Sequence, residues 1–275
     1  MQSRAAGGIT VVFDSSEQDT AELISDATAK ALRLIQESWG LKSPADCRIY
    51  VMTSWWGFIF QSAPWPWRIL LALALPFWCF RAGRTWPYSA AWTQRYGRRV
   101  AIGIKPPRLL ESSDKSIGVH MYIEEKETKI KVRHLACHEL THACSAHLKL
   151  PAWLNEGLAA VTVDRYLEKR TIRADTIELV KSFMPKARPL TYREMARQSG
   201  RAFAYHAVRG YWLVRYLEEK RPGFLKRALA SPRVARTIED DIAVELGIEP
   251  GGLWSKIDDM IVAHFEMKGA GIGEG

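Results

Sequence analysis

Hydrophobic and polar positions alternate in two recognisable rhythms along the first part of the chain. Residues 8–14 are a short β-branched run closed by polar residues, which predicts a buried strand. Residues 15–40 place apolar side chains at helical spacing behind a Ser-x-x-Gln start, which predicts a long helix. Residues 47–54 are again typical of a strand. This strand-helix-strand order favours a sheet with a helix packed against it.

The rest of the chain turns from mixed to helical. Residues 99–104 and 118–123 are strand-like, and a charged stretch at 124–132 leads into a histidine-rich helix. Helices are then expected at residues 175–183, 192–198, 202–220, 224–230, 237–247 and 253–265. The prediction is an α+β fold with an α+β domain at 1–170, a helical C-terminal subdomain at 171–268, and a disordered tail at 269–275.

One segment interrupts the first domain. Residues 55–97 hold seven of the eleven tryptophans and an apolar run at 69–80. A helix of that run would reach about 18 Å, which is short of the roughly 30 Å of a hydrocarbon core. Three interpretations of this insert remain open: a subdomain packed on the core, a peripheral contact with an anionic membrane, or a hydrophobic wall of a substrate cleft.

The positive charge of the chain is concentrated in the same region. The formal net charge is +9, and between Cys47 and Leu110 there are nine basic residues and no acidic one. The remaining chain carries 30 basic and 30 acidic residues. Because the basic residues alternate with long apolar runs, and not with polar positions that would face phosphate, we expect no nucleic-acid partner.

Cysteine usage and the N-terminus predict the compartment. The four cysteines, Cys47, Cys79, Cys137 and Cys144, form no C-x-x-C pair and no disulfide framework, which favours a reducing environment. Cys137 and Cys144 are expected to be small buried apolar residues. Residues 1–14 lack the apolar core of a signal peptide. We expect a cytoplasmic protein, with membrane association an open alternative.

An H-E-x-x-H motif at residues 138–142 carries the candidate chemistry. His138 and His142 are four residues apart, so on a helix their imidazoles lie on one face and can chelate one tetrahedral metal ion. Glu139 lies about 100° around the helix, where it can reach a metal-bound water as a general base.

A third ligand is predicted beyond a proline. A catalytic zinc usually has three protein ligands and one open position. Pro151 is a tolerated first residue of a second helix, and Glu156 follows in its first turns. A short turn between the two helices would bring Glu156 back to the histidine pair. The sequence therefore predicts one zinc ion held by His138, His142 and Glu156.

These residues carry a resemblance to a known group. H-E-L-T-H at 138–142, followed by W-L-N-E-G-L-A at 153–159, resembles the gluzincin metallopeptidases of the peptidase MA-like group, which are distant relatives of thermolysin and the zinc aminopeptidases. The likeness covers the strand-helix opening and most of residues 100–261, but not 55–97. It implies a zincin-like fold: a small twisted sheet, an active-site helix and a helical C-terminal subdomain. It also implies attack of activated water on a peptide carbonyl, with Glu139 passing the proton to the leaving amine.

The resemblance implies a further catalytic residue. Members of the group place a tyrosine of a later helix over the site, where its hydroxyl stabilises the oxyanion. Tyr205 matches that position best, and Tyr211 and His206 are neighbours that could take the role.

The residues that would support the metal ligands match the pattern of this group less well than the ligands do. Thermolysin-like enzymes support a histidine with an aspartate four residues after the ligand glutamate, and here that position is Ala160. Asp164, one turn further, is the nearest replacement, and Asn155 is expected beside it in this role. His134 lies one turn before His138 and is either a hydrogen-bonded helix histidine or a fourth ligand.

The predicted function is zinc-dependent hydrolysis of a peptide or protein substrate. An extended substrate would pair with an edge strand at residues 118–123, where Gly118, Val119 and His120 are the expected contacts. The alternative is a non-catalytic zinc scaffold that docks to a membrane or a protein through residues 55–97. A fourth protein ligand would favour the scaffold, and an open coordination position would favour the enzyme.

Overall fold

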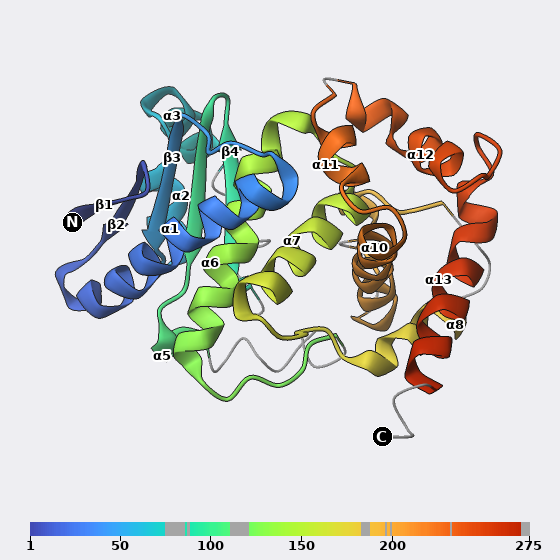
Figure 1. Cartoon of the computed structure of the whole chain (residues 1–275). Helices are drawn as coiled ribbons and strands as arrows, with labels where there is room; N and C mark the ends of the chain where they lie inside the picture. The colour runs from blue at the N-terminus through green and yellow to red at the C-terminus, as the bar shows by residue number, and fades with distance from the viewer. Residues whose placement is uncertain are drawn as a thin grey trace. The chain divides into compact units, whose positions relative to one another are not determined.

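A computed structural model describes residues 1–74, 86, 89–110, 121–182, 188–195, 197–198, 200–231 and 233–270. The fold is mixed α+β, as predicted, and the chain divides into two compact units. The first comprises Met1–Gln36, Leu41–Val119 and Glu124–Ala146, and the second Glu37–Gly40, His120–Ile123 and His147–Gly275. The sheet lies in the first unit, and the second is helical (Figure 1).

The sheet has five strands in the order β1-β2-β3-β5-β4. Their bounds are β1 Gln2–Ala6, β2 Ile9–Phe13, β3 Asp46–Val51, β4 Ala91–Tyr96 and β5 Arg99–Ile104. The central strands β2, β3 and β5 are parallel, and the outer strands β1 and β4 are antiparallel to their neighbours. Helix α1 (Gln18–Trp39) makes the crossover between β2 and β3. The three central strands and α1 confirm the elements predicted from the hydrophobic pattern.

Both outer strands were missed in the sequence. β1 turns into β2 through Gly7 and Gly8, whose φ angles of 57° and 84° are those of a mirror-image hairpin turn that glycine adopts without strain. β4 falls inside the segment 55–97 that the sequence analysis treated as an insert. Gly97, at φ 61°, begins the tight turn from β4 into β5. Residues 91–96 therefore belong to the sheet.

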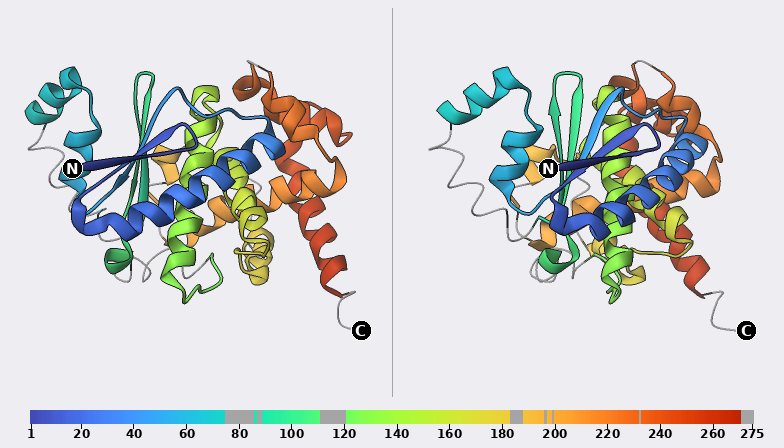
Figure 2. Two further views of the ribbon diagram at one scale, coloured as in Figure 1. Left: turned by 60° about the vertical axis from the view of Figure 1, so that its left-hand side comes forward. Right: turned by 90° about the vertical axis from the view of Figure 1, so that its left-hand side faces the viewer.

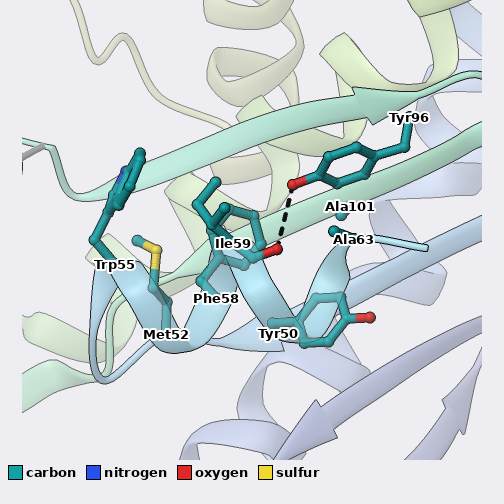
Figure 3. Close-up of a cluster of buried hydrophobic side chains, with 8 residues drawn as sticks. All are labelled: Tyr50, Met52, Trp55, Phe58, Ile59, Ala63, Tyr96 and Ala101. Atoms are coloured by element: carbon teal, nitrogen blue, oxygen red, sulfur yellow. Dashed lines mark hydrogen bonds between the residues drawn. The ribbon is translucent and has the colours of Figure 1, made fainter. Parts of the chain in front are cut away.

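Helices cover both faces of the sheet. Helix α2 (Trp55–Ser62) packs Phe58 and Ile59 into a buried cluster with Tyr50 of β3 and Tyr96 of β4 (Figure 3). Helix α6 (Thr128–Ser145) contacts β4 and β5 from the other face, which α1 also covers (Figure 2). Two shorter helices, α3 (Trp65–Leu73) and α5 (Pro107–Leu110), complete the first unit.

The second unit confirms the helical prediction for the chain after residue 170. Its helices are α7 Ala152–Leu167, α8 Ile177–Ser182, α9 Tyr192–Met195, α10 Gly200–Lys220, α11 Phe224–Leu229, α12 Val234–Glu245 and α13 Leu253–Ala270. Because α13 continues to Ala270, residues 269–270 are helical and not part of a disordered tail. Residues 271–275 lie outside the described part of the chain.

Two glycines set the distance between α7 and α10. A Cβ atom on Gly157 would lie 2.4 Å from the carbonyl oxygen of Gly210, and one on Gly210 would lie 2.0 Å from the carbonyl oxygen of Trp153. Real Cβ atoms do not approach backbone atoms so closely, so only glycine fits at both positions. The glycine that follows Glu156 in the sequence motif thus lets the two helices pack backbone against backbone.

A buried ion pair joins α10 to α13. The Arg209 guanidinium donates two hydrogen bonds of 2.8 Å to the carboxylate of Asp258, and both side chains are almost fully buried. The same guanidinium lies 4.5 Å above the ring of Trp254. Trp254 in turn packs edge-on against Trp153 of α7. These contacts connect the helix that carries Glu156 to the C-terminal helices of its unit.

The strand predicted at residues 118–123 is not part of the described sheet. Gly118, Val119 and His120 lie outside the described residues. Tyr122 forms a single antiparallel bridge with Ile172, and both belong to the second unit. In the part of the chain that the structure describes, no helix has the length and apolar content needed to cross a membrane.

Candidate metal centre

Helix α6 presents His138 and His142 together on one side. Its opposite side is buried through small and apolar residues such as Ala136 and Leu140. The two Nε2 atoms are 3.0 Å apart, and the rings meet edge to face with centroids 4.6 Å apart. Two nitrogens bound to one tetrahedral zinc at about 2.0–2.1 Å would be roughly 3.3 Å apart. The observed spacing therefore suits two ligands of one ion.

His134 lies one helical turn before the pair. Its ring stacks on that of His138 with a centroid distance of 6.3 Å. Among the described residues, the potential metal ligands grouped with His138 and His142 do not include His134. His134 is therefore a neighbour of the histidine pair and is not grouped with the candidate ligands.

Glu139 is fixed by the edge strand of the sheet. Its side chain is buried, and one carboxylate oxygen, Oε2, accepts a short hydrogen bond from the Thr93 hydroxyl on β4. Two residues further along β4, the Arg95 guanidinium donates a 2.8 Å hydrogen bond to the carbonyl oxygen of Ala146, where α6 ends. β4 thus holds the motif helix at two points, and one of them is the predicted general base.

Glu156 lies near the start of α7, which begins directly after Pro151 as predicted. Its Oε1 accepts a 2.8 Å hydrogen bond from the Tyr192 hydroxyl. The same hydroxyl accepts a 2.8 Å hydrogen bond from Nδ2 of Asn155. Tyr192 therefore links two neighbouring residues of α7 and orients the Glu156 carboxylate, and Asn155 acts on that carboxylate through the tyrosine.

One ligand atom from each of His138, His142 and Glu156 lies within 4.8 Å of the other two. Among the described residues this is the one group of histidine, cysteine, aspartate and glutamate side chains that could hold a metal ion. Two imidazole nitrogens and one carboxylate oxygen are the donor set of many catalytic zinc sites. The residues present fit a zinc ion with three protein ligands.

Asp164 has other partners than the predicted ligand histidine. Its Oδ1 accepts hydrogen bonds from the backbone N–H and the hydroxyl of Thr171, both at 2.7 Å. Its Oδ2 accepts a 2.7 Å hydrogen bond from the Tyr211 hydroxyl. Both carboxylate oxygens thus join the C-terminal end of α7 to the following segment and to α10. This arrangement gives Asp164 a structural role within the second unit.

The three candidates for oxyanion stabilisation differ in environment. The Tyr211 hydroxyl donates its hydrogen bond to Asp164, so its proton is already used in that contact. Tyr205 is buried, and its ring lies against His206 and below the guanidinium of Arg209. Burial raises the pKa of Tyr205, so it stays a neutral hydroxyl. Burial, with the nearby charge of Arg209, lowers the pKa of His206 to about 4.

The described cysteines are buried thiols. Cys47, Cys137 and Cys144 are all buried, and burial raises the pKa of Cys47 and of Cys144 to about 12. They are therefore protonated at neutral pH and unsuited to metal binding in that form. This confirms the prediction that Cys137 and Cys144 are buried small residues. Cys79 lies outside the described residues.

Two polar contacts of the site were missed in the sequence. Thr93 was overlooked because β4 was assigned to the tryptophan-rich insert. The β-rich run before Gly97, directly followed by the strand at residues 99–104, was the hairpin signal that could have located it. Tyr192 was predicted to start a helix but was given no function. Its hydroxyl contacts Glu156, which lies 36 residues earlier in the sequence, so no local pattern marks the contact.

Comparison of the chain with protein-family models, with curated proteins and with solved structures finds no match.

Proposed function

We propose that the protein is a zinc-dependent peptidase with a zincin-like arrangement. The observation that carries the proposal is the grouping of His138, His142 and Glu156, with a buried glutamate next to the first histidine. Two features of the fold support it: a sheet packed against the motif helix, and a second helix that carries the third candidate ligand. In the described residues the group contains three potential ligands and no fourth, which favours an enzyme over a structural zinc scaffold.

The chain's own residues supply the acid-base chemistry. A zinc ion bound here would act as a Lewis acid on water and on a substrate carbonyl. Thr93 occupies Oε2 of Glu139, which leaves Oε1 to accept a proton from water and deliver it to the leaving amine. Because the hydrogen bond fixes the carboxylate before substrate binds, little reorganisation is needed at the moment of proton transfer.

The strand next to Glu139 is the proposed substrate platform. β4 is the last strand in the order of the described sheet, and we propose that an extended peptide pairs with its outer edge. Thr93 is on this strand and touches Glu139, so a peptide paired with β4 would run alongside the proposed base. This assigns to β4 the substrate-pairing role that the sequence analysis gave to residues 118–123.

Glutamine in place of Glu139 tests the proposal. The variant Glu139→Gln keeps the shape and the acceptor oxygen for Thr93 but cannot take up a proton. We expect wild-type protein to contain one zinc ion and to cleave members of a quenched-fluorescence peptide library, and Glu139→Gln to keep its zinc and lose cleavage by at least about 100-fold. Zinc without cleavage in the wild-type protein would support the scaffold instead. Equal cleavage by the variant would rule out the mechanism.

A further inference from the structure

The segment at residues 55–74 has two halves with opposite environments. In α2, Trp55, Phe58 and Ile59 are buried against the sheet (Figure 3). In α3, which follows after Pro64, no residue is buried. Figure 2 shows α3 at the periphery of the first unit, outside α2. Helix α3 contacts the core only in part: Leu71 packs against the buried cluster and the Trp67 ring lies 5.8 Å from that of Tyr96, yet the helix buries no residue.

Helix α3 exposes an unusual amount of apolar surface for its length. Of the ten large hydrophobic residues that are exposed in the described part of the chain, five lie on these nine residues. They are Trp65 (71% exposed), Trp67 (44%), Ile69 (47%), Leu70 (56%) and Leu73 (74%). Exposed apolar residues that stand singly are ordinary, whereas a contiguous group marks a surface that binds something apolar.

The charge around α3 indicates what this surface binds. No acidic residue occurs between Cys47 and Leu110, whereas nine basic residues do. Four of the nine are already paired or buried: Arg48 and Arg99 pair with Asp46, Arg108 pairs with Glu17, and Lys105 is buried. Arg68, on α3 itself, donates hydrogen bonds to the backbone carbonyls of Ala63 and Gln61, and it forms no ion pair with an acidic residue in the described part of the chain. Arg98, in the turn between β4 and β5, is exposed as well. An apolar surface with positive charge complements a lipid bilayer whose headgroups are anionic.

The order of residues along α3 fits the layers of such a bilayer. Trp65, Trp67 and Arg68 lie in its first half, and the aliphatic Leu70 and Leu73 lie in its second half. Tryptophan rings prefer the headgroup level, arginine meets the phosphates, and leucine prefers the acyl chains.

We propose that α3 docks the protein onto anionic lipid bilayers by inserting Leu70 and Leu73 below the headgroups. The proposal is independent of zinc and of peptidase activity, because none of the residues involved lies in the candidate metal centre. It predicts that binding requires both the exposed leucines and anionic lipid.

Vesicle co-sedimentation of the full chain tests the proposal. We expect wild-type protein to pellet with vesicles of phosphatidylcholine and phosphatidylglycerol in equal parts, and at least about tenfold less with phosphatidylcholine alone. The double variant Leu70→Glu/Leu73→Glu should lose at least about tenfold in affinity for the anionic vesicles. Since both leucines are exposed, its thermal unfolding should match that of wild type, which circular dichroism can verify.

The matched control places the same charges elsewhere. Val244 and Met267 are 64% and 70% exposed in the second unit, so Val244→Glu/Met267→Glu adds equal negative charge without touching α3. This control should bind the anionic vesicles like wild type. No binding by wild type, or equal loss in both double variants, would overturn the proposal. A dimer of wild type in light scattering that Leu70→Glu/Leu73→Glu dissociates, without vesicle binding, would also overturn it and make a second copy the occupant of α3.

Discussion

The hydroxyl of Thr93 donates a short hydrogen bond to Oε2 of Glu139 and thereby ties the edge strand β4 to the motif helix α6. The two residues are 46 positions apart in sequence. In the proposed mechanism this contact orients the proton acceptor, so Thr93 is a positioning residue for Glu139.

Removal of the Thr93 hydroxyl should slow the chemical step. Thr93→Val keeps the size and the β-branched shape but leaves one carboxylate oxygen of Glu139 without its donor. We expect kcat to fall by about 10-fold with little change in KM, because the contact orients the base and not the substrate. Thr93→Ser restores a hydroxyl and should restore most of kcat. Equal kcat in all three proteins would remove Thr93 from the mechanism.

Alanine at Gly157 should destabilise the second unit. The added Cβ would lie 2.4 Å from the carbonyl oxygen of Gly210, so α7 and α10 must move apart. We expect the free energy of unfolding in urea to fall by about 3 kcal/mol. Gly247→Ala is the control, because a Cβ there meets nothing within 4 Å and costs only the strain of φ 70°, about 1 kcal/mol. A Gly157→Ala protein as stable as the control would contradict the packing described for α7 and α10.

The buried pair of Arg209 and Asp258 should show strong coupling. Arg209→Met leaves the Asp258 carboxylate buried without its partner, and we expect a loss of about 3–5 kcal/mol in the free energy of unfolding. The double variant Arg209→Met/Asp258→Leu removes both charges and should be more stable than Arg209→Met alone. Strictly additive losses in a double-mutant cycle would show that the two side chains do not form a pair.

Acid should destabilise the fold through His206. Its pKa in the folded chain is lowered from 6.5 to about 4, chiefly because it is buried. Between these pH values the unfolded chain binds a proton that the folded chain excludes, so stability is fully present above pH 6.5 and falls as the pH approaches 4. In His206→Gln this contribution is absent, so its melting temperature should fall less over that range than that of wild type. Parallel melting profiles would show that His206 is not held neutral by the fold.

The sequence correctly predicted those elements whose formation depends on residues close together in the chain. The strand at residues 99–104 and the start of α7 after Pro151 were located correctly, because β-branched alternation and a proline at a helix start act within a few residues. β4 was missed because its neighbours in sequence are tryptophans and prolines, although its partner in space is β5. β4 is a strand because it forms hydrogen bonds with β5, and the composition of the residues that flank it in sequence does not indicate this pairing.

The same distinction applies to the candidate site. The pairing of His138 with His142 follows from spacing along one helix, and the place of Glu156 near the start of a second helix follows from Pro151. Contacts between distant segments do not follow in this way. Asp164 was expected to support a histidine, whereas its two oxygens bind Thr171 and Tyr211. Such partners depend on the path of the chain after α7, and that path is determined by tertiary packing.

The most direct test of the account is the zinc content and zinc ligation of the wild-type protein beside Glu156→Ala. We predict one zinc ion per wild-type chain, with an X-ray absorption spectrum of two imidazole nitrogens, further oxygen ligands and no sulfur. In Glu156→Ala the affinity for zinc should fall by at least about 100-fold, whereas Glu249→Ala, an exposed glutamate elsewhere in the second unit, should bind zinc like wild type. A wild-type protein that binds no zinc, or a Glu156→Ala protein that binds it as tightly as wild type, would contradict the three-ligand site on which the proposed peptidase rests.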